Sequence, residues 1–278
     1  PLQRGFDRFY GFLGAETNFF SPGHIIEGNE FLPIDEHPES YYSTDDWTDH
    51  AIRYLRGHRS AAPDKPFFLY VAHNAPHVPL QARDEDIARY NGVYDAGWDT
   101  IRAQRFARQK AMGLVPENWR MATESPGVLA WDEVPEDKRA VMAHYMQVYA
   151  AMVDNVDHNL GRLVDELKAM GVYDNTLIVF TSDNGGNRYN EIDGTTPTSN
   201  RPLRGGKATM FEGGVRVPGV VVWPGVTEPG SRSDAPVQSE DYLPTLVEGL
   251  GLPTDAGAVR DGISLLPALK GGTIAERP

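Results

Sequence analysis

Three separate stretches of this 278-residue chain carry side chains that could do chemistry. Asp183 and Asn184 place a carboxylate beside an amide oxygen, and both are hard ligands of the kind that calcium and magnesium prefer. His77 could transfer a proton, and Lys207 could supply a fixed positive charge. A cation with a histidine and a lysine nearby would suit a tetrahedral oxyanion, because the positive groups neutralise its oxygens while the imidazole handles a proton at the leaving oxygen. We take this chemistry as a hypothesis from residue types alone.

The same stretches also have plainer interpretations. Asp183-Asn184-Gly185-Gly186 is typical of a turn, and these four residues by themselves favour the turn over a metal site. His73 is interpreted as a polar group that does not touch substrate. Glu212 is interpreted as a carboxylate that braces its loop, and Arg204 as an ion-pair partner ahead of a loop-orienting role.

Each of the three stretches is expected beside a strand. Leu177–Thr181 is apolar or β-branched and too short for a buried helix. Phe67–Ala72 is predicted as a second buried strand, ahead of the loop of His77, and Val215–Trp223 as a third, interrupted by Pro218. Strands that are apolar on both faces favour a parallel sheet covered by helices, and ligands gather beyond the carboxyl ends of such strands. We therefore predict an α/β fold, a mostly parallel sheet sandwiched by helices, with the site at its carboxyl edge.

Helices are predicted over residues 43–57, 96–112, 136–170 and 239–250. The third of these has the clearest period and ends at Gly171, which is typical of a helix stop. Because it leads directly into a predicted strand, helix and strand alternate as an α/β fold requires. Its predicted apolar side comprises Val141, Tyr145, Tyr149, Met152, Val156, Leu160, Leu163 and Leu167.

The composition excludes several classes of protein. A net charge of −13 argues against nucleic acid as a partner, since phosphate binding requires a basic face. No apolar run reaches the length of a membrane span. The absence of cysteine excludes disulfides and thiolate metal sites, and it leaves both bacterial cytoplasm and periplasm open. The oligomeric state is left undetermined.

Residues 81–138 are charged and broken by glycine and proline, which favours a surface insertion that shapes access to a pocket. Asn18, Phe19 and Phe20 are expected to line that pocket. The chain begins at Pro1 with core-like aromatic residues close behind, and both of its ends look cut. We therefore expect an internal piece of a longer protein.

Five segments in a fixed order resemble the sulfatase family of the alkaline phosphatase superfamily, in particular bacterial arylsulfatases. They are residues 4–14, 75–81, 180–186, 203–207 together with 212–214, and 261–267, and they run along nearly the whole chain. Any one of them is a weak signal, but all five in this order are specific. The resemblance implies that residues 1–278 form the central to C-terminal part of a sulfatase catalytic domain. It also makes a metal site, and no longer a simple turn, the favoured interpretation of Asp183 and Asn184.

The resemblance implies a role for each candidate residue. Asp183 and Asn184 would be ligands of a calcium ion, ahead of magnesium or manganese. Lys207 would contact the sulfate as a fixed positive charge, and His77 would bind the sulfate near the leaving oxygen and assist its departure. The substrate would be a small aryl or alkyl sulfate ester, split by an arylsulfatase-type hydrolase with release of inorganic sulfate.

One departure from the family pattern is large. Sulfatases attack with a formylglycine made from the Cys or Ser of a Cys/Ser-x-Pro-x-Arg motif, and no such motif occurs in these residues. We expect the formylglycine upstream of Pro1 and no turnover by this fragment alone. Two alternatives stay open: a phosphonate monoester hydrolase or phosphodiesterase of the same superfamily, and a non-catalytic relative that binds sulfated glycans.

Overall fold

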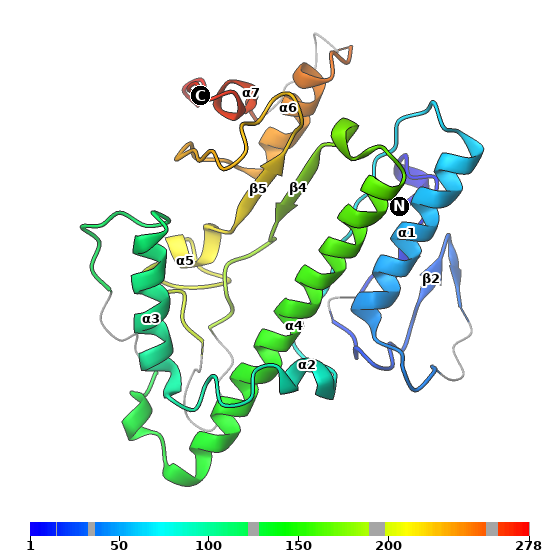
Figure 1. Cartoon of the computed structure of the whole chain (residues 1–278). Coiled ribbons are helices and arrows are strands. Elements are labelled where there is room, and N and C mark those ends of the chain that lie inside the picture. The colour runs from blue at the N-terminus through cyan, green and yellow to red at the C-terminus, as the bar shows by residue number, and fades with distance from the viewer. Residues whose placement is uncertain (15, 33–36, 122–127, 189–197, 254–260, 278) are drawn as a thin grey trace. The chain divides into compact units, whose positions relative to one another are not determined.

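The computed structural model describes residues 1–14, 16–32, 37–121, 128–188, 198–253 and 261–277 (Figure 1). The chain divides into two compact units. The first consists of residues 1–173 and 184–216, and the second of residues 174–183 and 217–278. None of the helices in the described ranges is long and apolar enough to cross a membrane.

The first unit opens with a small antiparallel sheet. A 3-10 turn, η1 (Leu2–Arg4), precedes strands β1 (Tyr10–Gly11), β2 (Ile26–Glu27) and β3 (Glu30–Phe31). The sheet order is β1-β2-β3, and Tyr10 pairs with Glu27 while Ile26 pairs with Phe31. The two-residue strands are too short to form a core of their own, so the sheet relies on the helix that follows it.

Helix α1 (Ser43–Ala61) begins where the sequence predicts and runs beyond the predicted end at Gly57. Asp45 and Asp46 lie in its first turn, where negative charge interacts favourably with the helix dipole. Its buried face includes Trp47, as expected.

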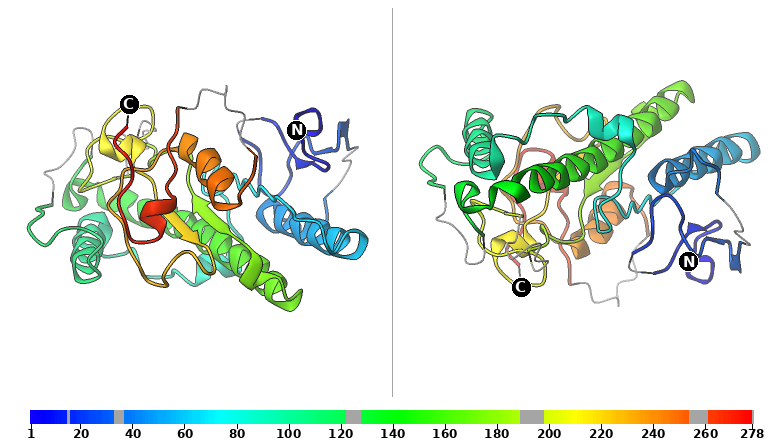
Figure 2. Two further views of the ribbon diagram at one scale, coloured as in Figure 1. Left: turned by 90° about the horizontal axis from the view of Figure 1, so that it is seen from above. Right: turned by 90° about the horizontal axis from the view of Figure 1, so that it is seen from below.

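Helix α4 (Glu136–Ala169) is the long helix that the sequence predicts, and α1 packs along it (Figure 1, Figure 2). Its buried face is only partly the predicted one. Met152, Leu163 and Leu167 are buried, but Val141 and Tyr149 are 44% and 45% exposed. Asn155 and Asn159 are buried instead.

The buried asparagines of α4 satisfy an acidic side chain of α1. The Nδ2 group of Asn159 donates to the Oδ1 atom of Asp45 at 2.7 Å, and that of Asn155 donates to the same atom at 3.3 Å. Asp45 also pairs with Arg83. The carboxylate of Asp45 is half-buried, and its partners make the α1–α4 contact polar where periodicity predicts apolar packing.

Residues 81–138 form α2 (Asp84–Ala88), α3 (Gly97–Ala111) and the 3-10 turn η2 (Trp131–Glu133). Helix α2 packs on α4 (Figure 2). Ala82 belongs to a core cluster with Phe19, while Trp98 and Val134 form another with Met142. The segment therefore contributes to the core of its unit, and its origin as an insertion stays a prediction.

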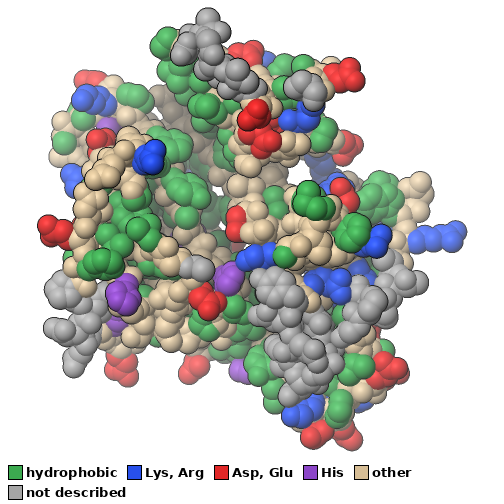
Figure 3. Space-filling view, turned by 180° about the vertical axis from the view of Figure 1, so that it is seen from behind, with side chains coloured by type: hydrophobic (Ala, Val, Ile, Leu, Met, Phe, Trp, Pro, Cys, Tyr) green, Lys and Arg blue, Asp and Glu red, His purple; other side chains and the backbone are tan. Residues whose placement is uncertain are grey.

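The predicted buried strand Phe67–Ala72 is wrong. The segment forms no strand, and both Phe68 and Tyr70 are 73% exposed. Exposed hydrophobic side chains also occur elsewhere along the chain, and Figure 3 shows in green those that lie on one face. A strand requires a hydrogen-bonded neighbour, and none of the described residues pairs with this segment.

In the second unit, β4 (Ile178–Thr181) and β5 (Gly219–Val222) form an antiparallel pair, with Ile178 opposite Val222. Both strands lie inside the predicted segments. All strand pairs in the described ranges are antiparallel, so the predicted parallel pairing is not found there. The predicted burial of β4 is also wrong, since Val179 and Phe180 are 41% and 38% exposed.

The other elements are short. The 3-10 turn η3 (Tyr173–Asn175) leads into β4, and α5 (Glu212–Val215) ends at the residue where the third strand was predicted to begin. The predicted helix 239–250 forms as η4 (Ser239–Asp241) followed by α6 (Tyr242–Gly249), and α7 (Leu266–Leu269) comes later. The fully buried Asp241 accepts hydrogen bonds from the backbone N–H of Gln238 at 2.8 Å and of Ile263 at 3.0 Å, which ties residue 263 to the start of α6.

Asp46 joins α1 to the small sheet of the first unit. Its carboxylate accepts hydrogen bonds from the Tyr10 hydroxyl at 2.7 Å and the Tyr41 hydroxyl at 2.9 Å, and it lies 3.1 Å from Nδ1 of His50. Burial raises the pKa of Asp46, but the hydrogen bonds from His50, Tyr10 and Tyr41 outweigh it and hold the pKa below its ordinary value. The carboxylate therefore stabilises the fold above the pKa of the unfolded chain, and this contribution is lost as the pH falls through the lowered pKa.

We predict that Asp46→Asn lowers the free energy of unfolding by about 1–3 kcal/mol at pH 7, because two tyrosine hydroxyls lose a charged acceptor. The difference from the native chain should shrink once the pH falls below about 4, where the unfolded carboxyl is protonated. Urea unfolding of the native chain and of Asp46→Asn, at pH 7 and below about pH 4, measures this difference in the free energy of unfolding. Asp165→Asn, at an 80% exposed side chain, serves as the control. A stability loss that is independent of pH would contradict the prediction.

Candidate active site

His77 lies on the loop after residue 72, where its backbone N–H donates to the Asn74 carbonyl at 2.8 Å. Its Nδ1 atom lies 3.0 Å from the carbonyl oxygen of Val78. A carbonyl can only accept, so Nδ1 carries the hydrogen in this contact. In the neutral ring, Nε2 is then left with a free lone pair.

Lys207 lies against that lone pair. Its Nζ atom is 3.3 Å from Nε2 of His77, although the two residues are 130 positions apart in the sequence. An ammonium group can only donate, which agrees with a neutral imidazole that accepts at Nε2. The two predicted catalytic residues are therefore brought together within the first unit.

The backbone on either side of Lys207 is held by hydrogen bonds. The N–H of Lys207 donates to the Gly186 carbonyl at 3.0 Å, and the N–H of Gly185 donates to the Gly214 carbonyl at 2.9 Å. The Nδ2 group of Asn200 also donates to the Gly186 carbonyl, at 2.9 Å. Ala208, next to Lys207, has a φ of 68°, a left-handed conformation that a non-glycine residue holds only when its surroundings impose it.

Glycine is required where residues 184–186 meet residues 204–214. A Cβ atom on Gly185 would collide with the carbonyl oxygen of Gly213, and one on Gly206 would collide with that of Gly186. The segments thus approach through backbone atoms alone, which a side chain at either position would prevent. Gly185 and Gly186 are therefore part of the framework that positions Lys207.

The two predicted metal ligands follow β4 directly. Asp183 belongs to the second unit and Asn184 to the first. The ranges that the structure describes contain no group of three or more His, Cys, Asp or Glu side chains that could hold a metal. One carboxylate and one amide oxygen suit calcium by their chemistry, and the assignment of Asp183 and Asn184 to such a site stays a prediction.

Neighbouring residues differ in how well the sequence predicts them. The Arg204 guanidinium lies 3.8 Å from the centroid of the Phe211 ring, a cation–π contact where an ion pair was predicted. Glu212 pairs with Arg216 at 3.2 Å, which fits the predicted bracing role. Burial lowers the pKa of His73 to about 4, so this histidine is neutral at pH 7.

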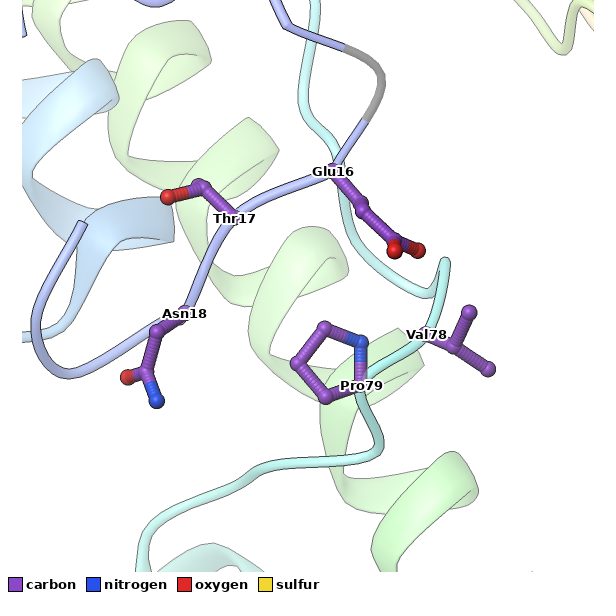
Figure 4. A pocket seen from close by; sticks show the side chains of 5 residues that line it. All are labelled: Glu16, Thr17, Asn18, Val78 and Pro79. Carbon is purple, nitrogen blue, oxygen red and sulfur yellow. The ribbon is translucent and has the colours of Figure 1, made fainter. Parts of the chain in front are cut away.

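An open cleft of about 480 Å³ lies beside His77. It is lined by Glu16, Thr17 and Asn18 on one side and by Val78 and Pro79 on the other (Figure 4). Of the residues predicted to line a pocket, Asn18 does so, whereas Phe19 is fully buried in the core and Phe20 is 37% exposed.

Glu16 was not predicted. Its Oε2 atom lies 3.8 Å from Nδ1 of His77. A single acidic residue in a loop has no local pattern that marks it, so only its position in the fold identifies it.

Comparison with known proteins defines the class. The Sulfatase family model matches residues 2–252 of the chain. The chain is 31% identical over 293 residues to an uncharacterised sulfatase of Schizosaccharomyces pombe, covering 89% of this chain and 52% of that protein. It is 29% identical over 294 residues to the arylsulfatase of Klebsiella aerogenes, covering 91% of this chain and 62% of that enzyme. This chain belongs to the sulfatase family.

Solved structures agree with this assignment. The crystal structure of Ps i-CgsB in complex with k-i-k-neocarrahexaose has a TM-score of 0.67 at 30% identity, covering 96% of this chain and 51% of that one. The predicted fold class, α/β of the alkaline phosphatase and sulfatase type, is thereby confirmed. The chain spans about half the length of the relatives it matches. Sulfatases act on sulfate esters and are generally metal-dependent enzymes that use formylglycine.

We predict that Gly185→Ala lowers the free energy of unfolding by about 1–3 kcal/mol, because the new methyl group meets backbone atoms that cannot rotate away. Urea unfolding measures the loss, and the ¹⁵N chemical shift of His77 should change with it as Lys207 moves. Gly57→Ala in α1, where no atom lies within 4 Å of the added carbon, is the matched control and should be neutral or stabilising. Equal stability of the two variants would contradict the close approach at Gly185.

Proposed function

We propose that the complete protein containing this chain hydrolyses sulfate monoesters as an arylsulfatase-type enzyme. The observation that carries the proposal is the contact between Lys207 Nζ and His77 Nε2 in a chain of the sulfatase family. The two groups converge on one small region, where both could reach the oxygens of a single sulfate. An aryl or small alkyl ester is the substrate class we infer, by analogy with the arylsulfatase relatives.

Lys207 would bind the sulfate as a fixed cation. Its ammonium now lies against the imidazole, and an arriving sulfate oxygen would accept hydrogen bonds from Nζ in place of Nε2. The negative charge of the sulfate would also allow the imidazole to be protonated next to the ammonium, because it separates two cations that would otherwise repel.

His77 would then act on the leaving group. With Nδ1–H held by the Val78 carbonyl, the second proton of the imidazolium is on Nε2, the atom that faces the substrate. As the sulfur–oxygen bond breaks, this proton would pass to the leaving oxygen and yield a neutral alcohol or phenol. The ring orientation set by Val78 thus determines which nitrogen delivers the proton.

The nucleophile and the metal complete the proposal. We place the formylglycine outside these 278 residues, because they contain no Cys/Ser-x-Pro-x-Arg motif. Asp183 and Asn184 would provide two oxygen ligands for calcium, ahead of magnesium or manganese. The ion would supply further neutralisation of charge on the sulfate oxygens.

The two alternatives are weaker. The phosphonate monoester hydrolases are matched in fold alone, at 23% identity. A non-catalytic relative that binds sulfated glycans would have little need for a proton donor aimed at the ester, and His77 counts against it. Calcium-dependent stabilisation of the complete protein without turnover would favour that relative, and preference for a phosphonate ester would favour the hydrolase.

The first test is Lys207→Ala in the complete enzyme. We expect kcat/KM for 4-nitrophenyl sulfate to fall by about 10²–10³, because a preorganised positive group at the sulfate is lost. The unfolding midpoint should change little, since the loop is held by backbone hydrogen bonds. Lys168→Ala, at a side chain 56% exposed, is the matched control. Loss of fold with normal specific activity in the surviving protein would make Lys207 structural.

The second test is Asp183→Ala, also in the complete enzyme. We expect calcium to stop raising the melting temperature and turnover to disappear in the same variant, because one carboxylate ligand is lost. Differential scanning fluorimetry with calcium and with a chelator provides a readout that is independent of activity. Asp174→Ala, at an exposed position of η3, should keep both properties. Retained activity in Asp183→Ala would refute the metal assignment.

A further inference from the structure

We propose that the cleft between residues 16–18 and 78–79 binds the leaving group of the ester, and that Glu16 makes it select against anionic leaving groups. This inference rests on the proposed sulfatase function. It goes beyond it by assigning a specificity-determining residue and the charge of the favoured substrate.

The position of the cleft supports this assignment. A proton donor must lie within hydrogen-bond reach of the leaving oxygen, so the leaving group starts at His77. Val78 and Pro79, which form one wall, directly follow His77 in the chain. The opposite wall reaches the same ring, since the Glu16 carboxylate lies 3.8 Å from Nδ1 of His77. These contacts lie at the Nδ1 edge of the ring and the leaving oxygen lies at the Nε2 edge, so a leaving group that extends past the ring reaches this cleft.

The two chain segments that form the walls are linked by hydrogen bonds next to the cleft residues. The Oε1 atom of Gln81 accepts a hydrogen bond from the N–H of Phe19 at 2.8 Å, and the carbonyl of Gln81 accepts one from the Tyr42 hydroxyl at 2.8 Å. Phe19 is fully buried and stacks on Tyr42. Asn18 fixes the turn that follows, because its Oδ1 accepts from the N–H groups of Phe20 and Ser21 at 2.9 Å. The cleft is thus preformed by core contacts.

The lining determines what the cleft can hold. Val78 and Pro79 present an apolar surface that suits an aromatic ring or the C–H face of a sugar. Glu16 is the one charged side chain among the lining residues, and Figure 4 shows it extending from residues 16–18 toward the segment of Val78. A carboxylate accepts hydrogen bonds from hydroxyl or ammonium groups and repels carboxylates and further sulfates. Neutral polar or cationic leaving groups are therefore favoured.

Glu16 also lies close enough to His77 to affect the chemistry of every substrate in the same way. The two effects are separable, because selection by charge changes the ratio between substrates whereas an effect through His77 cancels in that ratio. Three phenyl sulfates that differ at one position supply the comparison: 4-(hydroxymethyl)phenyl sulfate, 4-(aminomethyl)phenyl sulfate and 4-(carboxymethyl)phenyl sulfate.

The experiment measures kcat/KM for the three esters in the complete enzyme and in Glu16→Gln and Glu16→Lys. The native enzyme should prefer the cationic and neutral esters over the anionic one. Because the Glu16 side chain is 58% exposed, we expect Glu16→Gln to reduce that preference only about three-fold, and Glu16→Lys to invert it. Glu212→Gln removes a 62% exposed carboxylate outside the cleft and should leave the ratios unchanged. Ratios that are the same in the native enzyme and both Glu16 variants would overturn the proposal.

Failure of the cleft and failure of the proposed function give different results. Turnover of all three esters without a dependence on Glu16 refutes the cleft and leaves the sulfatase function intact. If no ester is hydrolysed, the proposed function fails, and calorimetric affinities of the same three esters then test the cleft by itself. Affinities that follow ester charge in the native protein and invert in Glu16→Lys would support it, and affinities independent of charge would overturn it.

Discussion

The contact between the Lys207 ammonium and the His77 imidazole is the constraint on which the site depends. At 3.3 Å it requires a neutral ring with its lone pair on Nε2, and the Val78 carbonyl imposes that tautomer by accepting from Nδ1–H. Both groups that could meet a sulfate thus lie together before any substrate binds. Preorganisation of this kind removes much of the cost of orienting groups at the moment of reaction.

Glycine packing keeps Lys207 where the contact needs it. Residues 184–186 and 204–214 meet through backbone hydrogen bonds and leave no room for a Cβ at Gly185 or Gly206. A long, rotatable lysine side chain cannot define its own position, so a rigid backbone must do so. The same arrangement explains why two glycines follow Asn184 and two precede Lys207.

The contact between helices α1 and α4 in the first unit is partly polar. Helices α1 and α4 pack around Asp45, which two buried asparagines and Arg83 satisfy. Asn155 and Asn159 are buried and need hydrogen-bond partners, so their bonds to Asp45 orient α4 about its own axis. That orientation presents Met152 to the core cluster shared with Phe19, which also supports one wall of the cleft.

Local sequence by itself determined the helices and the residue types of the site. The periodicity and end signals of α1, α3, α4 and α6 are formed by residues close along the chain, so they could be interpreted without knowledge of the fold. Ordered motifs likewise identified His77 and Lys207 as candidates. Only the tertiary structure decided which residues meet. It left Phe67–Ala72 unpaired, made the pairs of β4 and β5 antiparallel, buried Asn155 in place of Tyr149, and brought Glu16 to His77. Strand pairing, the rotation of a helix about its axis and the assembly of the site all depend on residues that are distant in the chain. No local pattern encodes which of these distant residues will come into contact.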